Sequence, residues 1–278
     1  MADPNDISRN YQDHGYVTAL DLFSQTEIEG YRQCFDEFEA REGKENCQIG
    51  LQARHLDEEF IWRMASDSRI IDLMASIMGE DILLLSTHFF CKYPDPDGAK
   101  FVAWHQDVTY WGLEPPEAHT AWIAIDDSDV ENGCMQIVRG SHKLGLLDHM
   151  VDGAFTGACQ ESDRRSDPGL IANITPKAGG ISIHHCLALH GSEPNLSGRP
   201  RRGLVFQYRA DDAYQLADNV FKDTGILVSG QRRERVRCEE GVFRLPKRPA
   251  NQHPFGAAWN QDGDVAKLRD YDFDADVQ

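Results

Sequence analysis

The sequence predicts a mainly β fold whose N-terminal part is helical. Up to about residue 80, apolar residues recur at helical spacings. From Asp81 onward, short apolar and β-branched runs alternate with turn-forming Gly, Pro, Asp and Asn. Several short strands with few helices among them are typical of a β-sandwich or barrel. All-β barrels of ~250 residues commonly form one domain, so we expect a single domain over residues 1–278.

Two helices are expected before the strands begin. Ser24-Gln25-Thr26-Glu27 is a capping-box pattern, and apolar residues follow it at spacings of three and four. A second helix is expected over Ser68–Met78, with Gly79 as its C-cap. Ahead of the first helix, Gly15-Tyr16-Val17 is compatible with a short strand.

Strands are expected where apolar or β-branched runs end at turn residues. They cover residues 82–93, 101–109, 120–125, 134–138, 181–190 and 203–209. Residues 143–170 are polar and have no clear periodicity, which favours a functional loop or lid over an interdomain linker. Beyond Asp211 the pattern is harder to interpret, and the acidic end is expected to be frayed or bound to the surface.

Composition narrows the range of partners. The formal net charge of −18 argues against nucleic acid and against an anionic membrane surface. No apolar run approaches the ~20 residues of a membrane span, and the polar N-terminus lacks the features of a secretory signal. The seven cysteines form no Cys-x-x-Cys pair and are expected to be reduced thiols. We therefore expect a cytoplasmic protein with a small-molecule substrate; the oligomeric state is not predicted.

The most informative stretch for chemistry is Trp104-His105-Gln106-Asp107. On a strand, His105 and Asp107 point to the same face, because side chains alternate with period 2. His190 from a distant strand would complete a set of two imidazoles and one carboxylate, which non-haem Fe(II) oxygenases use. Arg201, eleven residues beyond His190, is a natural partner for a co-substrate carboxylate, because its planar fork binds carboxylates bidentately.

Three ordered blocks between about Gly15 and Arg209 resemble the phytanoyl-CoA dioxygenase family of Fe(II)/2-oxoglutarate-dependent oxygenases. The blocks are residues 104–111, residues 121–143 with Glu131-Asn132-Gly133 and Gly140-Ser141-His142, and residues 185–192 followed by Asn195 and Arg201. The resemblance implies a double-stranded β-helix (jelly-roll, cupin-like) core with flanking helices. In this scheme residues 20–80 are the helical support, residues 81–210 the core and residues 211–278 a C-terminal extension.

The resemblance also implies roles by position. His105, Asp107 and His190 match the iron ligands, with 2-oxoglutarate and O2 as co-substrates. Arg201 and Ser192 match the pair that holds the distal carboxylate of 2-oxoglutarate, and Trp122 and His88 match two further contacts. Halogenating relatives have Ala or Gly where this chain has Asp107, so hydroxylation of an unactivated C–H is favoured, with succinate and CO2 as the products of 2-oxoglutarate.

Several assignments have competing interpretations. His185 competes with His190, which is preferred because Gly191-Ser192 and the offset to the arginine fit it. Arg199 and Arg202 lie close to Arg201, which only that offset singles out. Trp122 is compatible with a position in the core. Lys92 is expected to be solvated beside a turn.

Four further residues are candidates for contact with the substrate. His184 would share a face with His190 on a regular strand, as a pocket or structural histidine. Tyr110 and Trp111 are compatible with a pocket wall or with packing against the lid. Arg139 stands where the family usually has proline, and it would favour an anionic substrate group or lie on the surface paired with an acid.

Other classes of function fit parts of the pattern. A zinc hydrolase uses similar ligands but has no need of Arg201 and Ser192. A non-catalytic jelly-roll binding protein is a third class, against which the intact ligand set argues. Within the family, the lack of an added CoA-binding segment favours a small polar metabolite, such as an ectoine-like compound or an aminoalkylphosphonate, or a natural-product intermediate. Acyl-CoA hydroxylation is the alternative.

Overall fold

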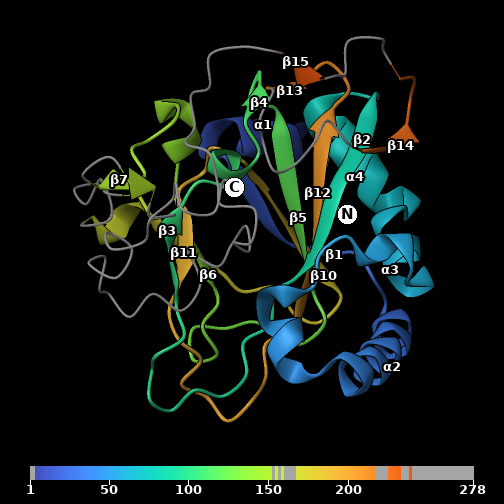
Figure 1. Ribbon diagram of the computed structural model, residues 1–278, viewed down its shortest axis with the longest axis vertical. Helices are drawn as coiled ribbons and strands as arrows, with labels where there is room; N and C mark the ends of the chain where they lie inside the picture. Colours follow the sequence, from blue (N-terminus) through green and yellow to red (C-terminus); the bar gives the residue numbers. More distant parts are fainter. Residues whose placement is uncertain are drawn as a thin grey trace, which may run out of the picture.

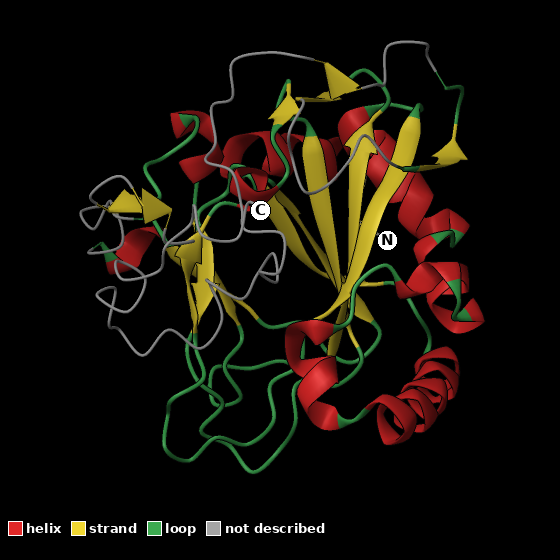
Figure 2. Cartoon of the chain, in the orientation of Figure 1, coloured by secondary structure: helices red, strands yellow, loops and turns green. Residues whose placement is uncertain are grey.

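The computed structural model describes residues 4–151, 154–155, 158–159, 167–216, 225–232 and 238–239. Two antiparallel sheets face each other, and helices flank the larger one (Figure 1). The major sheet has the strand order β1-β10-β5-β12-β2-β14, and the minor sheet has the order β3-β11-β6-β9. Figure 2 shows the two sheets as separate layers with loops connecting them. The expected mainly β fold with flanking helices is confirmed.

The strands of the two sheets come from distant parts of the chain. The major sheet contains β1 (Tyr16–Asp21), β2 (Ile82–Phe89), β5 (Ala118–Ala124), β10 (Gly180–His185), β12 (Gly203–Ala210) and β14 (Ile226–Ser229). The minor sheet contains β3 (Val102–His105), β6 (Met135–Val138), β9 (Ile171–Ile174) and β11 (His190–Ser192). Smaller pairings involve β4 (Leu113–Glu114), β7 (Met150–Val151), β8 (Ala154–Phe155), β13 (Tyr214–Leu216) and β15 (Cys238–Glu239).

Four α-helices and five short helical turns complete the described elements. The α-helices are α1 (Pro4–His14), α2 (Gln25–Glu42), α3 (Glu59–Ala65) and α4 (Ser68–Met78). The turns are the π-helical η1 (Asn46–Gly50) and the 3-10 turns η2 (Arg54–Leu56), η3 (Asp107–Tyr110), η4 (Ser141–Leu144) and η5 (Pro168–Leu170). No helix in the described part of the chain is long and apolar enough to cross a membrane.

The main hydrophobic core lies between the helices and one face of the major sheet. Phe35 and Phe38 of α2 and Met74 of α4 are buried against it. On β12, Leu204, Phe206 and Tyr208 belong to this core, whereas Val205 and Gln207 line a pocket on the opposite face. This period-2 alternation gives the sheet an apolar helix-facing side and a pocket-facing side.

The expected N-terminal elements are confirmed. Ser24 caps α2 with a complete capping box, α4 covers Ser68–Met78 with Gly79 at its C-cap, and Tyr16 begins a strand. Two helices were not expected: α1 and α3. In α1, few apolar residues signal a helix, but Tyr11 is buried and its hydroxyl hydrogen-bonds to His119 Nδ1 at 2.5 Å. Tertiary contacts thus support this helix.

Three of the expected strands differ from prediction in ways that matter for function. The strand expected over 101–109 ends at His105, and Asp107 begins the 3-10 turn η3. The strand expected over 181–190 is two strands, β10 and β11, which belong to different sheets. The strand expected over 82–93 ends at Phe89. A local alternation pattern does not reveal where a strand ends or where the chain passes from one sheet to another.

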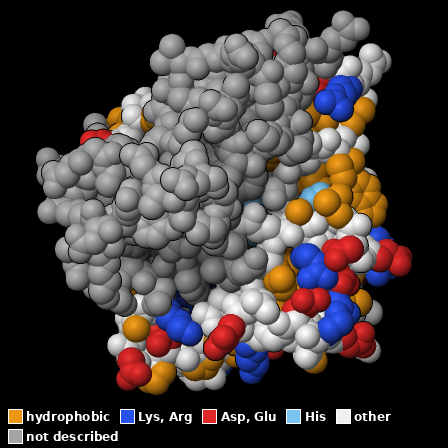
Figure 3. Space-filling model, viewed as in Figure 1, with side chains coloured by type: hydrophobic (Ala, Val, Ile, Leu, Met, Phe, Trp, Pro, Cys, Tyr) orange, Lys and Arg blue, Asp and Glu red, His pale blue; other side chains and the backbone are white. Residues whose placement is uncertain are grey.

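The major sheet also contains two strands from outside residues 81–210. Strand β1 pairs with β10, and β14 pairs with β2, both antiparallel. Part of the 143–170 stretch forms β7, β8 and η5, while residues 152–153, 156–157 and 160–166 lie outside the described residues, as does the acidic end 262–278. On the described surface in Figure 3, acidic and basic side chains are interspersed despite the net charge of −18.

Candidate active site

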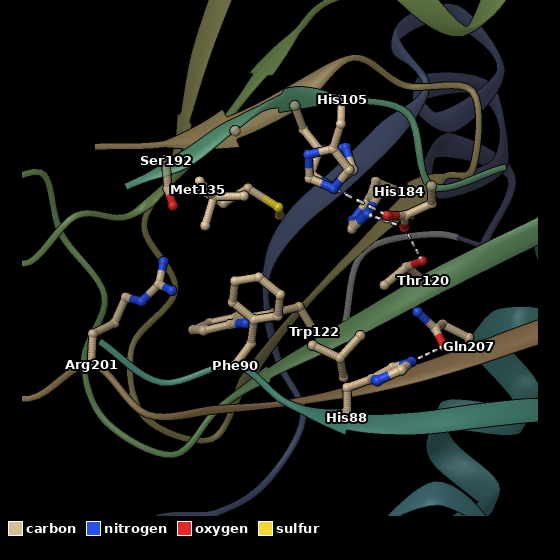
Figure 4. Close-up of a pocket in the computed structure, with 15 residues that line it drawn as sticks. His88, Phe90, His105, Thr120, Trp122, Met135, His184, Ser192, Arg201 and Gln207 are labelled. Atoms are coloured by element: carbon tan, nitrogen blue, oxygen red, sulfur yellow. Dashed lines mark hydrogen bonds and ion pairs between the residues drawn. The ribbon is translucent and has the colours of Figure 1, made fainter. Parts of the chain in front are cut away.

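A pocket lies between the two sheets and is lined by residues of both (Figure 4). From the minor sheet and the turn after it come His105, Asp107, His190 and Ser192, while the major sheet supplies Thr120 and Trp122. The empty volume is about 510 Å³ and is partly open to solvent.

Two histidines and an aspartate converge on one point of this pocket. His105 Nε2 lies 3.4 Å and His190 Nε2 lies 3.6 Å from Asp107 Oδ1. The ligand atoms of the three residues all lie within 4.8 Å of one another, and all three side chains are buried. Strand pairing explains part of the convergence, because His190 of β11 stands directly opposite His105 of β3.

The hydrogen bonds of both imidazoles fix which nitrogen faces the pocket. His105 Nδ1 lies 2.8 Å from the carbonyl oxygen of Ala103, and His190 Nδ1 lies 2.9 Å from that of Ala188. Because carbonyl oxygens only accept, each Nδ1 must donate, and each Nε2 then carries the lone pair. Burial lowers the pKa of His190 well below its usual range, as does the neighbouring His105, which favours the neutral ligand form.

Asp107 is an ionised carboxylate in a buried setting. Burial by itself raises its pKa, but the neighbouring imidazoles of His190, His105 and His184 outweigh this and hold the pKa well below its ordinary value. Asp107 Oδ2 accepts from Thr120 Oγ1 at 2.7 Å and lies 3.2 Å from His184 Nε2. Oδ1 therefore faces the two imidazoles while Oδ2 is already paired.

The far end of the pocket contains a buried arginine. Arg201 is 2% exposed, and its Nη1 donates to the carbonyl oxygen of Gly133 at 2.7 Å. Within the described residues, the Nε of Arg201 has no hydrogen-bond partner and the side chain makes no ion pair. Burial lowers the pKa of Arg201 to about 10. Ser192 lines the same pocket and is labelled near the guanidinium in Figure 4.

Lys92 supports this end of the pocket from behind. Its backbone pairs with that of Arg201 through two N–H···O bonds of 2.8 Å, and its Nζ donates to the carbonyl oxygens of Ser192 and Glu193. Lys92 is 2% exposed, so the expectation of a solvated lysine was wrong. These carbonyl oxygens take the place of water around the Lys92 Nζ. Burial and the charge of Arg201 lower the pKa of Lys92 well below its usual range.

Trp122 forms a wall between the two ends. Its indole lies 5.5 Å from the Arg201 guanidinium carbon and packs directly on Gly203, where a Cβ would meet the ring at 2.3 Å. Only glycine leaves room for the indole in this position. On the next strands, His88 Nε2 lies 2.6 Å from Gln207 Oε1, and both residues line the pocket.

Comparison with known proteins places this geometry in a family. A model of the family described as "Phytanoyl-CoA dioxygenase (PhyH)" matches residues 11–203. The chain belongs to the phytanoyl-CoA dioxygenase family. A protein of Stutzerimonas stutzeri described as a probable alpha-ketoglutarate-dependent hypophosphite dioxygenase is 30% identical over 261 residues, covering 86% of this chain and 90% of that protein.

One further relative and one solved structure are also similar to this chain. The ectoine dioxygenase of Halomonas elongata is 26% identical, covering 73% of this chain and 68% of its own. A solved structure of a non-heme monooxygenase, ThoJ in the apo form, has a TM-score of 0.68 with 24% identity, and covers 95% of this chain and 96% of that chain. The structural likeness supports the jelly-roll fold expected from the sequence.

As a member of this family, the chain is a 2-oxoglutarate-dependent oxygenase whose cofactor is Fe(II). The residues present fit that cofactor: two imidazole lone pairs and one carboxylate oxygen lie together in a buried pocket. Imidazole and carboxylate form the 2-His-1-carboxylate set of non-haem iron oxygenases. The expected family, enzyme class and cofactors are confirmed.

The structure brings most of the sequence-predicted site residues of this phytanoyl-CoA dioxygenase family member into one pocket. The pocket-lining residues among them are His88, His105, Asp107, Trp122, His184, His190, Ser192 and Arg201. His184 is on β10, not on the same strand as His190, and reaches the site from the opposite sheet. His185 does not line the pocket; its Nδ1 accepts from the backbone N–H of Leu187 at 3.0 Å.

Three of the candidates for substrate contact do not line the pocket. Tyr110 and Trp111 are fully buried in a cluster with Leu113, and the Tyr110 ring packs edge-on against His105 at 5.9 Å. Arg139 is exposed and donates to the Tyr16 hydroxyl and the Gly169 carbonyl oxygen, each at 3.2 Å. These positions favour the packing interpretation for the two aromatic residues and the surface interpretation for the arginine.

Sequence reasoning missed seven pocket-lining residues, among them Phe90, Thr120 and Gln207. Thr120 lies two residues before Trp122 on β5, and Gln207 lies two residues after Val205 on β12. The period-2 rule could have found both once one residue of each strand was assigned to the pocket. Phe90 follows the end of β2, so alternation gives no guide there.

Proposed function

We propose that this chain is a hydroxylase in which His105, Asp107 and His190 hold Fe(II), while Arg201 and Ser192 hold the distal carboxylate of 2-oxoglutarate. One observation carries this proposal: the two-histidine, one-carboxylate cluster and the buried Arg201, which makes no ion pair within the described residues, line the same pocket. A zinc hydrolase would use the cluster but not the arginine.

The residues around the pocket would each contribute a physical effect. When bound, iron and 2-oxoglutarate would supply oxidation by dioxygen: one oxygen atom would enter succinate as CO2 is lost, and the other would oxidise the substrate. The neutral imidazoles and Asp107 would occupy one side of the metal and leave the other positions free. Arg201 would fix the far carboxylate of 2-oxoglutarate through charge-assisted hydrogen bonds. Trp122 and Phe90 would keep water from the co-substrate.

The substrate we propose is a small polar metabolite whose C–H bond is hydroxylated. The relatives named for hypophosphite and ectoine support this class, since both compounds are small and water-soluble. The net charge of −18 makes a highly anionic CoA thioester a less favourable partner. The plant phytanoyl-CoA dioxygenase matches at 26% identity over 59% of its own length, so acyl-CoA remains the alternative to be tested.

Oxidation of a P–H bond is a second candidate. The hypophosphite relative matches at 30% identity and covers 90% of its own length. Hypophosphite is a small oxyanion that would fit any pocket large enough for a metabolite. A substrate panel must therefore contain hypophosphite beside ectoine, an aminoalkylphosphonate and a fatty acyl-CoA.

An anaerobic titration tests the reaction class. Addition of Fe(II) and 2-oxoglutarate to the apoprotein should give a weak visible charge-transfer band, and the Arg201→Met variant should need far more 2-oxoglutarate to give it. Absence of the band, with tight retention of zinc, would support a hydrolase. Succinate release across the substrate panel then identifies the substrate, since coupled turnover requires it.

We further propose that residues 1–278 form one domain. Strand β1 near the start and β14 near the end of the described chain join the same sheet, which supports this. Thermal unfolding should then show one cooperative transition, whereas two separate transitions would contradict the proposal.

A further inference from the structure

The carboxylate of Asp107 has two oxygens with different surroundings. Oδ1 faces the Nε2 atoms of His105 and His190, at 3.4 and 3.6 Å. Oδ2 accepts a hydrogen bond from Thr120 Oγ1 at 2.7 Å and lies 3.2 Å from His184 Nε2. One oxygen is thus directed at the metal position, while the other is already engaged by two protein groups.

These two groups form a single structural unit on the major sheet. Thr120 of β5 and His184 of β10 stand opposite each other in the antiparallel pairing, so their side chains lie on the same face. Asp107, by contrast, belongs to the turn that follows β3 of the minor sheet. The contacts from Thr120 and His184 therefore cross the pocket from one sheet to the other and meet at a single oxygen.

The hydrogen bonding of His184 argues for a specific task rather than general packing. Its Nε2 faces a carboxylate, which only accepts, so this nitrogen donates. Its Nδ1 is buried and, among the described residues, has no hydrogen-bond partner. A buried polar atom without a partner costs free energy. This cost falls on a residue whose Nε2 hydrogen-bonds to Asp107.

We infer that Thr120 and His184 are positioning residues that hold Asp107 so that it binds iron through Oδ1 alone. This inference rests on the proposed function. If Oδ2 were free to turn, the carboxylate could chelate the metal with both oxygens and occupy a position that 2-oxoglutarate or dioxygen needs. Two donors on Oδ2 prevent that rotation, because turning the carboxylate would leave both donors without their acceptor in a buried site.

The test compares Thr120→Val with Thr120→Ser. Valine keeps the shape of threonine but removes the hydroxyl, whereas serine keeps the hydroxyl. We expect Thr120→Val to weaken Fe(II) affinity about tenfold, within the ~10–100-fold range for loss of a group that orients a metal ligand. We also expect the anaerobic charge-transfer band with 2-oxoglutarate to shift, and Thr120→Ser to restore both values.

Two further variants separate positioning from general stability. His184→Phe removes the second donor and keeps a ring, so it should shift the same band and weaken Fe(II) binding. Ser182→Ala is the matched control: Ser182 lies two residues before His184 on β10, is 1% exposed, and its hydroxyl has no hydrogen-bond partner in the described part of the chain. It should match the wild type in Fe(II) affinity and in the band. The apoprotein melting temperature of each variant reports any loss of fold.

The outcomes are distinct from those of the proposed function. If the wild type gives no band with Fe(II) and 2-oxoglutarate, the proposed function fails. If the wild type gives the band, and both Thr120→Val and His184→Phe keep its position and the wild-type Fe(II) affinity, the positioning role is overturned while the proposed function stands. A lower melting temperature with unchanged metal affinity would overturn it too, because Thr120 and His184 would then be merely structural.

Discussion

The metal-binding end of the pocket and the end that contains Arg201 differ in how their charges are balanced. At the first end, the Asp107 carboxylate is surrounded by the imidazoles of His105, His184 and His190. At the second end, the guanidinium of Arg201 contacts a carbonyl oxygen at 2.7 Å and, within the described residues, no carboxylate. Both ends are buried, so solvent does little to screen either charge.

This difference is the basis for proposing that the arginine end takes an anion from outside the chain. A buried charge is costly unless it is paired, and the drop in the pKa of Arg201 to about 10 reflects that cost of burial. An anionic co-substrate would supply the missing charge. The metal end instead has its hydrogen bonds arranged in advance and needs a cation. Substitutions at the metal end, at the arginine end, in the wall between them and at a site outside both should therefore have different effects.

Replacing Asp107 should have the largest effect. Asp107→Ala removes the only carboxylate of the cluster, so we expect hydroxylation to be abolished. Fe(II) affinity should fall by more than the ~10–100-fold that loss of an outer partner costs. Equilibrium metal binding and succinate release measure the two effects. The control is Asp57→Ala, which removes an exposed carboxylate paired with Arg54. Full activity in Asp107→Ala would refute its assignment as a ligand.

Replacing Arg201 should separate co-substrate binding from metal binding. Arg201→Met removes the charge-assisted hydrogen bonds proposed for 2-oxoglutarate, which at about 2–3 kcal/mol corresponds to a roughly 30- to 150-fold rise in the KM for 2-oxoglutarate. Fe(II) affinity should change little. Arg199→Met is the matched control, because Arg199 is half-exposed and pairs with Asp129. An equal rise in KM for both variants would contradict the choice of Arg201.

A methyl group at Gly203 should disturb the wall between the two ends. The added Cβ of Gly203→Ala would lie 2.3 Å from the Trp122 ring, so the indole must move. Overpacking of this kind costs about 1–3 kcal/mol, which chemical denaturation would measure. We expect the KM for 2-oxoglutarate to rise as well, because Trp122 also stacks near Arg201. An unchanged KM would show that Trp122 is a core residue only.

A glycine-to-alanine substitution outside the pocket should have the smallest effect on stability, and it should raise the free energy of unfolding instead of lowering it. Gly30 lies on the exposed face of α2, and a Cβ added there meets no atom within 4 Å. Glycine inside a helix is less stable than alanine by roughly 0.5–1 kcal/mol, so Gly30→Ala should stabilise the fold by that amount. Activity should stay at the wild-type level. Destabilisation here would mean that the face of α2 has a contact outside the described residues.

Local signals in the sequence were most reliable where short-range physics decides the structure. The capping box at Ser24 and the C-cap at Gly79 involve atoms within one helical turn, and both were predicted correctly. The same reasoning failed at Asp107, which was expected to face the same way as His105 through strand alternation. The strand ends at His105, and η3 delivers the carboxylate instead. The structure does place Asp107 beside His105 and His190, but not for the reason expected from the sequence.

The sequence alone determined the chemistry of the site: the residue types and spacing of His105, Asp107, His190 and Arg201 indicated the metal and the co-substrate. These are properties of side chains and of their order along the chain. Only the tertiary structure decided how they are supported. It divides residues 180–192 between two sheets and brings Thr120 and His184 onto the carboxylate of Asp107. It also buries Lys92 behind Arg201. Such contacts depend on which strands pair across the whole chain, and no local pattern encodes that choice.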